Sequence, residues 1–280
     1  MWIDTHCHLD ASEFDADRGS VTEAAVAAGV SGIVLPAVAV SNFDAVRGLA
    51  HADPRCVYAL GIHPLCSRDA GQADLDELRR QVAASIDDRR FVAIGEIGLD
   101  FFVPGLDAAH QTWLYAEQLK IAREFDLPVL LHVRKSQDQV LAQLRRAGVR
   151  QGIAHAFNGS NDQARNYVAH GMKLGFGGNV TFSRARQIRR LATEMPLESI
   201  VLETDAPDIA PAWLSDDQFG EQHKARNTPG EVAGVARVLA ELRGVTEREL
   251  ADIAWRNSVA ALPRLAAFAD IMAPRQAAQI

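Results

Sequence analysis

Three things are scarce or missing in this sequence: cysteine, long apolar runs and a surplus of positive charge. The three cysteines, Cys7, Cys56 and Cys66, include no CxxC pair. So small and odd a number excludes a disulfide framework and favours a reducing compartment. No apolar run reaches the roughly 20 residues that cross a bilayer, and the opening residues do not have the pattern of a signal peptide. We therefore expect a cytoplasmic protein that makes no use of a membrane.

The formal net charge of −7 over 280 residues excludes a broad basic surface. A protein that grips long duplex DNA through lysine and arginine is usually basic. Any phosphate in the substrate must therefore be attracted by a local positive charge. With 48% hydrophobic and 23% charged residues, the chain is typical of a globular protein with a large core.

Short β-rich runs alternate with helical segments along the whole chain, without a linker or a change in composition. The runs are 2–6, 32–37, 57–62, 91–97, 128–133, 152–156, 172–176 and 199–204. The helical segments are 21–28, 73–86, 107–125, 136–147, 161–170, 231–242 and 247–262, with Asp107 and Thr246 as expected N-caps. This alternation predicts an α/β protein, a single (β/α)8 TIM barrel domain spanning residues 1–280. An open doubly wound sheet is the alternative, but no GxGxxG loop follows the first run.

The expected strands end in polar side chains of a particular kind. In a (β/α)8 barrel the chemistry lies at the C-terminal ends of the strands. Six of the eight runs end in histidine or a carboxylate, and these residues are His6, His8, His63, Glu96, His132, His155 and Asp205. Strand alternation places His6 and His8 on one side. The same alternation places Glu96 on the side of Val92 and Ile94, facing the barrel interior.

Histidines and carboxylates gathered at one barrel mouth suit metal ions. Four imidazoles and two carboxylates are enough for two divalent ions, with one carboxylate bridging them. Imidazole favours Zn or Mn over Mg, and all three stay open. Each histidine alone is more often a satisfied core group. Crowded together without a metal, however, the six groups would leave one another unsatisfied, so we expect two divalent metal ions.

The motifs THCHLD, GIHP, GEIGLD, LPVLLHVR, HAFNGS and ETDAP follow one another along nearly the whole chain. In this order and spacing, the set resembles the TatD family of metal-dependent deoxyribonucleases, which belongs to the amidohydrolase superfamily of (β/α)8 barrels. The resemblance implies metal ligands at His6, His8, Glu96, His132, His155 and Asp205. It further implies that Glu96 bridges two metals, that His6, His8 and Asp205 complete one, and that His132 and His155 complete the other.

Three positions depart from the common family pattern. Val133 stands where a serine is common, Ala156 where a cysteine is common, and Thr228 replaces the acid of an RNEP motif. None of the three is an expected ligand. We expect them to line or brace the mouth, so they bear on the substrate range.

Two further acids face inward by strand alternation. Asp4 and Glu203 are expected to accept the free ring N–H of ligand histidines and to fix their tautomers. The alternative is an interior ion pair with a nearby basic group. His63 lies at the mouth outside the implied ligand set, and we favour a substrate contact or a proton donor there.

Substrate contacts are expected from the loops behind the ligands. Arg134, followed by Lys135, is suited to clamp a phosphate, unless both are simply solvated charges. Asn158 offers hydrogen-bond donors to a substrate, or else shapes its loop. Phe102, beside Phe101, either stacks a nucleobase or packs its loop against the rim.

These features together predict a metal-dependent hydrolase. Glu96 and Asp205 are the expected catalytic residues: Glu96 bridges two ions that activate a water, and Asp205 accepts its proton. The preferred substrate is DNA, cleaved from single-stranded or frayed ends, with a monomeric enzyme and no obligate protein partner. The alternative is a hydrolase of a non-nucleic-acid ester, amide or lactone on the same barrel. Many amidohydrolases carry a modified lysine on the fourth strand, where this chain has Glu96. A non-catalytic metal-binding protein is the third hypothesis, and the complete ligand set argues against it.

Overall fold

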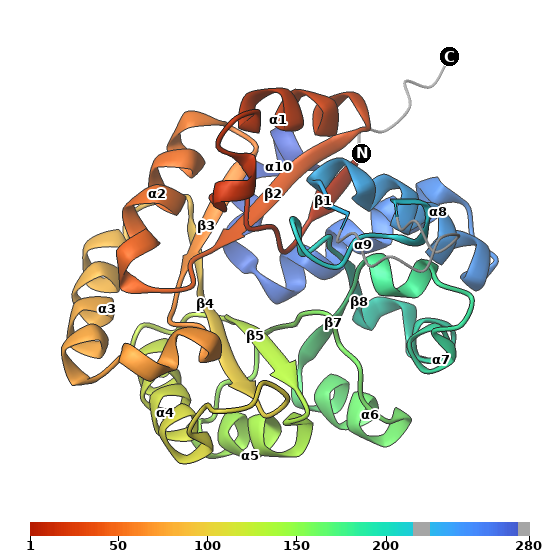
Figure 1. Ribbon diagram of the computed structural model, residues 1–280. Helices are drawn as coiled ribbons and strands as arrows, with labels where there is room; N and C mark the ends of the chain where they lie inside the picture. The colour runs from red at the N-terminus through yellow and green to blue at the C-terminus, as the bar shows by residue number, and fades with distance from the viewer. Residues whose placement is uncertain (215–224, 274–280) are drawn as a thin grey trace.

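Parallel strands form the centre of the molecule. The computed structural model describes residues 1–214 and 225–273. Eight parallel strands pair in chain order, and the sheet curls into a barrel (Figure 1). The strands are β1 Trp2–Asp4, β2 Val30–Pro36, β3 Cys56–Leu60, β4 Phe91–Asp100, β5 Val129–Arg134, β6 Gly152–Ala154, β7 Met172–Phe176 and β8 Ile200–Leu202. Backbone hydrogen bonds from Thr5 N to Leu202 O (3.0 Å) and from Asp205 N to His6 O (2.8 Å) join the last strand to the first. The expected (β/α)8 TIM barrel is confirmed.

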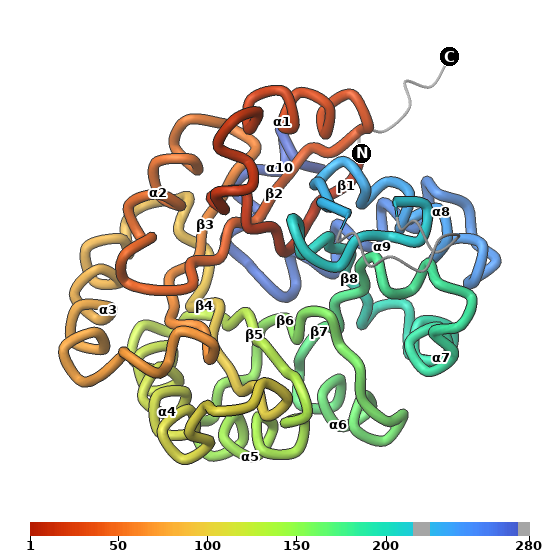
Figure 2. Tube along the Cα trace, viewed as in Figure 1, coloured from red at the N-terminus to blue at the C-terminus, as the bar shows by residue number. Residues whose placement is uncertain are grey.

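Helices surround the strands in an outer ring, which the tube in Figure 2 follows around the barrel. The ring consists of α1 Arg18–Ala27, α2 Phe43–Ala52, α3 Gln72–Ser85, α4 Ala108–Glu124, α5 Gln137–Ala147, α6 Asn161–His170, α7 Arg186–Glu194, α8 Val232–Arg243 and α9 Glu247–Ala261, and the short α10 Ala269–Met272 lies at the N-terminal end of the barrel. Asp107 caps α4 by accepting from Ala109 N and His110 N, and Thr246 caps α9 by accepting from Glu249 N. Both expected caps are confirmed. Among the described helices, none is long and apolar enough to cross a bilayer.

Two helices of the ring, α2 and α7, were not expected from the sequence. Helix α7 contains three arginines and buries only Leu191 and Ala192, so its apolar stripe is too thin to stand out. Helix α2 is short and carries Gly48, a weak helix former. Packing against the barrel, rather than helix propensity, stabilises both.

The barrel interior is closed at its N-terminal end by the C-terminal part of the chain. Inward side chains of the strands, such as Ile3, Val57 and Val201, form one apolar cluster with residues of the C-terminal segment. That segment contributes Ala261, Leu262, Leu265, Phe268 and Met272. Its end is fixed by the Ser31 hydroxyl, which donates to Met272 O at 2.7 Å. The barrel is therefore packed below, and only the opposite mouth is available for chemistry.

The alternation expected along β4 is wrong at Ile94. Val92 packs in the interior cluster, whereas Ile94 packs in the outer cluster between strands and helices. The pairing register of β4 shifts against β3 near Ala93 and against β5 between Ile94 and Ile97. These irregularities change which side chains of β4 point inward between Val92 and the C-terminal end of the strand. In spite of this change, Glu96 faces the mouth.

Candidate metal centre

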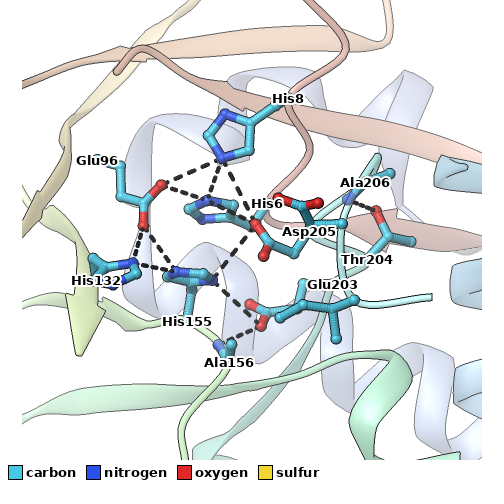
Figure 3. A network of polar contacts seen from close by, with 12 residues as sticks. His6, His8, Glu96, His132, His155, Ala156, Glu203, Thr204, Asp205 and Ala206 are labelled. Carbon is cyan, nitrogen blue, oxygen red and sulfur yellow. Dashed lines mark hydrogen bonds and ion pairs between the residues drawn. The ribbon is translucent and has the colours of Figure 1, made fainter. Parts of the chain in front are cut away.

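Seven polar side chains converge at the C-terminal mouth of the barrel, four of them buried and three half-buried. They are His6, His8, His63, Glu96, His132, His155 and Asp205, and most of their contacts appear in Figure 3. Glu96 from β4 lies at the centre with 1% of its side chain exposed. Its two carboxylate oxygens face two different groups of imidazoles. The ligands expected from the sequence therefore lie in one cluster.

The first group surrounds Glu96 Oε2. Nε2 of His6 lies 3.0 Å from this oxygen, and Nε2 of His8 lies 3.3 Å from it. The two Nε2 atoms are 3.3 Å apart. Asp205 Oδ1 completes the group at 3.6 Å from His6 Nε2 and 3.7 Å from His8 Nε2.

The second group surrounds Glu96 Oε1. His155 Nε2 lies 2.8 Å from this oxygen and His132 Nδ1 lies 3.0 Å from it. His63 Nε2 is also close, at 3.3 Å from Oε1 and 3.0 Å from His132 Nδ1. His63 therefore touches the cluster directly, and it does so through a single nitrogen.

Both groups have the spacing of metal ligands. A tetrahedral or octahedral ion with bonds of about 2.1 Å holds neighbouring ligand atoms roughly 3.0–3.4 Å apart. The distances within the two groups scatter around this range. Three of the ligand sets that geometry alone selects are His6–His8–Glu96, His6–His155–Asp205 and His63–Glu96–His132. The donor set therefore fits divalent metal ions, and Glu96 is placed to contact both groups.

The charges in the cluster are strongly coupled. Burial opposes the charge of Glu96, but the imidazoles around it, His155 first, hold its pKa well below the ordinary value. Burial likewise lowers the pKa of His8 and His155, yet contacts with Glu96 outweigh it and raise the two values to about 9 and about 10. Burial, followed by the charge of His155, lowers the pKa of His6 to about 3. In the metal-free site Glu96 therefore favours protonation of His8 and His155, and these protons compete with a metal for the same imidazole nitrogens.

Comparison with known proteins identifies the family. A family model described as TatD related DNase matches residues 3–263. The chain belongs to the TatD family. The uncharacterized metal-dependent hydrolase YjjV of Escherichia coli K12 is 39% identical over 258 residues, which cover 92% of this chain and 96% of that protein. The uncharacterized metal-dependent hydrolase YabD of Bacillus subtilis is 31% identical over 260 residues, which cover 92% of this chain and 97% of that protein.

Solved structures agree with this assignment. The crystal structure of YjjV, a TatD homolog from Escherichia coli K12, has a TM-score of 0.86 at 37% identity and covers 94% of this chain and 98% of that one. A TatD family hydrolase of Entamoeba histolytica has a TM-score of 0.81, covers 93% of this chain and 97% of that one and, at 22% identity, shows the fold alone. The protein is therefore a metal-dependent hydrolase of the TatD family.

Asp100 orients one histidine of this cluster, His132, and was not singled out from the sequence. Its Oδ2 lies 2.9 Å from His132 Nε2, on the side of the ring opposite Glu96. Burial opposes its charge, but His132 and two backbone N–H groups lower the pKa of Asp100 to about 2. An ionised carboxylate on Nε2 holds the ring proton there and leaves Nδ1 free as the donor toward the metal group. Its position in the GEIGLD motif was the available signal.

His63 is oriented by the backbone of its own loop. Leu65 N–H donates to His63 Nδ1 at 3.1 Å. A neutral imidazole that accepts at Nδ1 carries its proton on Nε2, and this N–H points at the cluster. Burial lowers the pKa of His63 in spite of nearby Glu96, which keeps the ring neutral. His63 is therefore built as a hydrogen-bond donor into the site.

Asp4 and Glu203 lie beneath the ligands. Asp4 Oδ1 accepts from His6 N at 3.2 Å and from Thr204 N at 2.9 Å, and Oδ2 accepts from the Thr204 hydroxyl at 2.6 Å. Asp4 thus binds backbone N–H groups and a hydroxyl rather than a histidine ring, so the contact expected for it is wrong. It ties the backbone that carries His6 to the segment that carries Asp205.

Glu203 is deeply buried and incompletely partnered. Its Oε1 accepts from Ala156 N at 2.5 Å and lies 3.9 Å from His155 Nδ1. Within residues 1–214 and 225–273, neither Glu203 Oε2 nor His155 Nδ1 has a hydrogen-bond partner. Burial raises the pKa of Glu203 to about 8. A Cβ on Gly175 of β7 would lie 2.0 Å from Oε2, so glycine leaves the room that this carboxyl occupies.

Asn227 supports the loop that carries Asp205, and sequence reasoning missed this role as well. Its Nδ2 donates to Thr204 O at 2.8 Å and to Asp208 O at 2.9 Å. Asp205 itself has φ +59°, a conformation that non-glycine residues rarely adopt. Buried Asn227 therefore helps to hold an unusual backbone at the mouth. Its place in the RNTP segment was the available signal.

The expected substrate contacts lie at the rim. The Arg134 side chain is 50% exposed, with Nη1 3.9 Å from Asp100 Oδ2. Asn158 is exposed, and its backbone carbonyl accepts from Gln137 Nε2 at 2.7 Å. Arg134 thus lies near Asp100, which contacts His132, whereas the hydrogen bond of Asn158 is with Gln137.

The three departures from the family pattern lie in different environments. Val133 packs in the outer apolar cluster, away from the barrel interior. Ala156 contributes a backbone N–H to Glu203, which any residue but proline supplies. Thr228 N donates to the Asn227 side chain at 2.9 Å. Cys7, between His6 and His8, is fully buried in the outer apolar cluster.

Proposed function

We propose that this TatD family hydrolase cleaves phosphodiester bonds in DNA, using two divalent metal ions, and that it works from single-stranded or frayed ends. The proposal rests on the position of Glu96, whose two carboxylate oxygens face two different groups of imidazoles. The family description, TatD related DNase, supports the same class of substrate.

The residues present fit two ions. His6, His8 and Asp205 with Glu96 Oε2 would hold one, and His132 and His155 with Glu96 Oε1 would hold the other. Two ions held by these residues would supply Lewis acidity, an activated water and positive charge for the phosphate oxygens. The donors suit Zn or Mn better than Mg. The positive charge of the ions would offset the repulsion between DNA and a protein of net charge −7.

Asp205 is the proton acceptor in this proposal. Burial raises the pKa of Asp205, against the opposing effect of His155. A carboxylate at the site is a suitable acceptor for the proton of a metal-activated water. With 14% of its side chain exposed, Asp205 is more accessible than Glu96 and faces the mouth where water enters. Glu96 takes part in catalysis in this proposal because its two oxygens contact both groups of imidazoles and so would hold both ions.

Two hydrogen-bond donors, His63 and Arg134, would orient the phosphodiester. The Nε2–H of neutral His63 points into the site and would donate to a non-bridging oxygen. The guanidinium of Arg134 lies at the rim, where it would pair with a phosphate of the strand outside the mouth. Asn158, exposed on the next loop, is a secondary contact of the strand.

The position of the cluster favours DNA ends. The ligands lie at the mouth of a barrel packed with side chains, and His6 and Glu96 are 0% and 1% exposed. A phosphate within an intact duplex would meet the loops of the rim before it reached Glu96. A single strand or a frayed end is narrow enough to be inserted.

Metal-stripped protein provides the test. It is incubated with linear single-stranded DNA, circular single-stranded DNA, duplex DNA, RNA and simple esters, amides and lactones, with Zn, Mn and Mg added back separately. We expect linear single strands to be shortened from an end and circles to resist. The Glu96→Gln variant, purified identically, should be inactive. Equal cleavage by that variant, or faster turnover of a lactone, amide or simple ester than of DNA, would overturn the proposal.

A further inference from the structure

An exposed aromatic ring stands beside the metal centre. Phe102, directly after β4, is 55% exposed, more than the other large apolar side chains in the described part of the chain. The guanidinium of Arg134 lies 4.0 Å from the centre of its ring, in cation–π contact. The rest of the ring is therefore accessible from solvent beside the metal centre.

The structure separates Phe102 from its neighbour Phe101. Phe101 is partly buried and packs against the outer apolar cluster, whereas Phe102 belongs to none of the apolar clusters of the described chain. The loop does not depend on the Phe102 ring, because Asp100 Oδ1 accepts from Phe102 N at 2.8 Å and from Val103 N at 3.0 Å. Packing of the loop therefore does not account for this side chain.

Asp100 connects the ring to the metal centre. The same carboxylate that fixes the backbone of Phe102 lies 2.9 Å from His132 Nε2 and 3.9 Å from Arg134 Nη1. The opposite nitrogen of His132 lies 3.0 Å from Glu96. Phe102 and Arg134 are thus held in a fixed relation to a ligand imidazole rather than on a free surface.

We propose that Phe102 is a stacking platform for the nucleobase next to the phosphate bound at the metal centre. The proposal rests on the proposed phosphodiester hydrolysis, for which it names a determinant of substrate choice. Arg134 covers part of the ring and pairs with phosphate, while the remaining exposed surface receives the base. A platform of this kind accepts any base, because every base has a π face.

Binding of two small ligands tests the platform without any catalysis. One ligand is deoxyadenosine 5′-monophosphate, and the other is 1,2-dideoxyribose 5-phosphate, which carries hydrogen in place of the base. The phosphate, and with it the contribution of metals and Arg134, is common to both. In titration calorimetry of the metal-loaded protein, we expect the nucleotide to bind roughly tenfold more tightly, the order of one base stacked on one ring.

Three variants of Phe102 and one control define the result. Phe102→Ala should bring the affinity ratio of the two ligands to about one, and Phe102→Leu should do nearly the same, because leucine keeps apolar bulk without a π face. Phe102→Trp should keep the tenfold ratio. Trp113→Ala, which removes another exposed aromatic ring on α4, should also keep it.

The outcomes separate this proposal from the proposed function. Equal affinities in the wild type, no measurable nucleotide binding, or an unchanged ratio in Phe102→Leu would each overturn the platform. Failure to cleave any phosphodiester while the tenfold ratio persists would overturn the proposed reaction and leave the platform supported.

Discussion

Replacing Asp100 by asparagine changes one hydrogen bond of the candidate metal centre and preserves the rest. An asparagine carbonyl oxygen still accepts from the backbone N–H groups of Phe102 and Val103, as Asp100 Oδ1 does now. Its amide nitrogen then replaces the oxygen that lies 2.9 Å from His132 Nε2. If His132 binds a metal through Nδ1, its Nε2 carries a proton, so two donors face each other. Turning the amide over would instead break both backbone bonds.

The magnitude follows from the contact that is lost. A hydrogen bond to a charged group contributes about 1.5–3 kcal/mol. Partners behind ligand histidines typically change metal affinity by about 10–100-fold, which corresponds to roughly 1.4–2.8 kcal/mol. We therefore expect Asp100→Asn to weaken one of the two metals by about 10–100-fold, with little effect on the group formed by His6 and His8.

Asp88 offers a matched control outside the site. Its Oδ2 lies 2.8 Å from His51 Nε2 and its Oδ1 accepts from Arg90 N at 2.9 Å, so Asp88, like Asp100, joins a histidine ring to a backbone N–H; its Oδ2 also accepts from the Tyr58 hydroxyl at 2.8 Å. Competition titrations with a metal chelator should show wild-type affinities for Asp88→Asn. Circular dichroism would verify that both variants fold. Equal metal affinities in Asp100→Asn, Asp88→Asn and the wild type would refute the role of Asp100.

Three further predictions concern the reaction and its pH dependence. Asp205→Asn should lower kcat about 10²–10⁴-fold while retaining at least one metal ion. Near wild-type turnover that still falls at acidic pH as in the wild type would show that Asp205 is not the base. Arg134→Ala should raise KM on DNA about tenfold at unchanged metal content. Unchanged kinetics would show that Arg134 is a solvated charge without a role in binding. In chelated protein the pKa values of His8 and His155, lowered by burial but raised further by Glu96, stand at about 9 and about 10. Protonation of these two histidines then contributes fully to the free energy of unfolding below the pKa of an unfolded-state histidine, about 6.5. This contribution is lost as pH rises toward 9–10. Metal binding, which needs neutral imidazoles, should release protons and tighten over the same window; calorimetry in buffers of different ionisation enthalpy that shows no proton release would contradict this.

The sequence by itself determined the barrel and the composition of the site. Strand periodicity and helical periodicity are local properties, so the alternation could be read without tertiary contacts. In parallel strands all C-terminal ends meet at one edge, so His6, Glu96 and Asp205 could be expected to converge although they lie far apart in the chain. The expected caps Asp107 and Thr246 were likewise local signals, and the structure contains both.

Local periodicity was insufficient where packing decided the element. Helix α7 is short and rich in arginine, with Leu191 and Ala192 as its buried residues, and it was not recognised in the sequence although its few apolar residues lie on one side. The inward side of β4 changes because its register shifts against both neighbours, so Ile94 packs outward although simple alternation placed it inside. Register is a property of strand pairs and is not encoded in one strand alone.

The tertiary structure also decided which atoms meet. Only the folded chain shows that the oxygens of Glu96 face different imidazole groups, and that His132 presents Nδ1 because Asp100 holds Nε2. Only the loop backbone shows that His63 carries its proton toward the cluster. These choices depend on side-chain rotamers and on hydrogen bonds between distant segments, which residue spacing does not contain. The sequence supplied the donors, and the packing of the barrel set their tautomers, orientations and pairing.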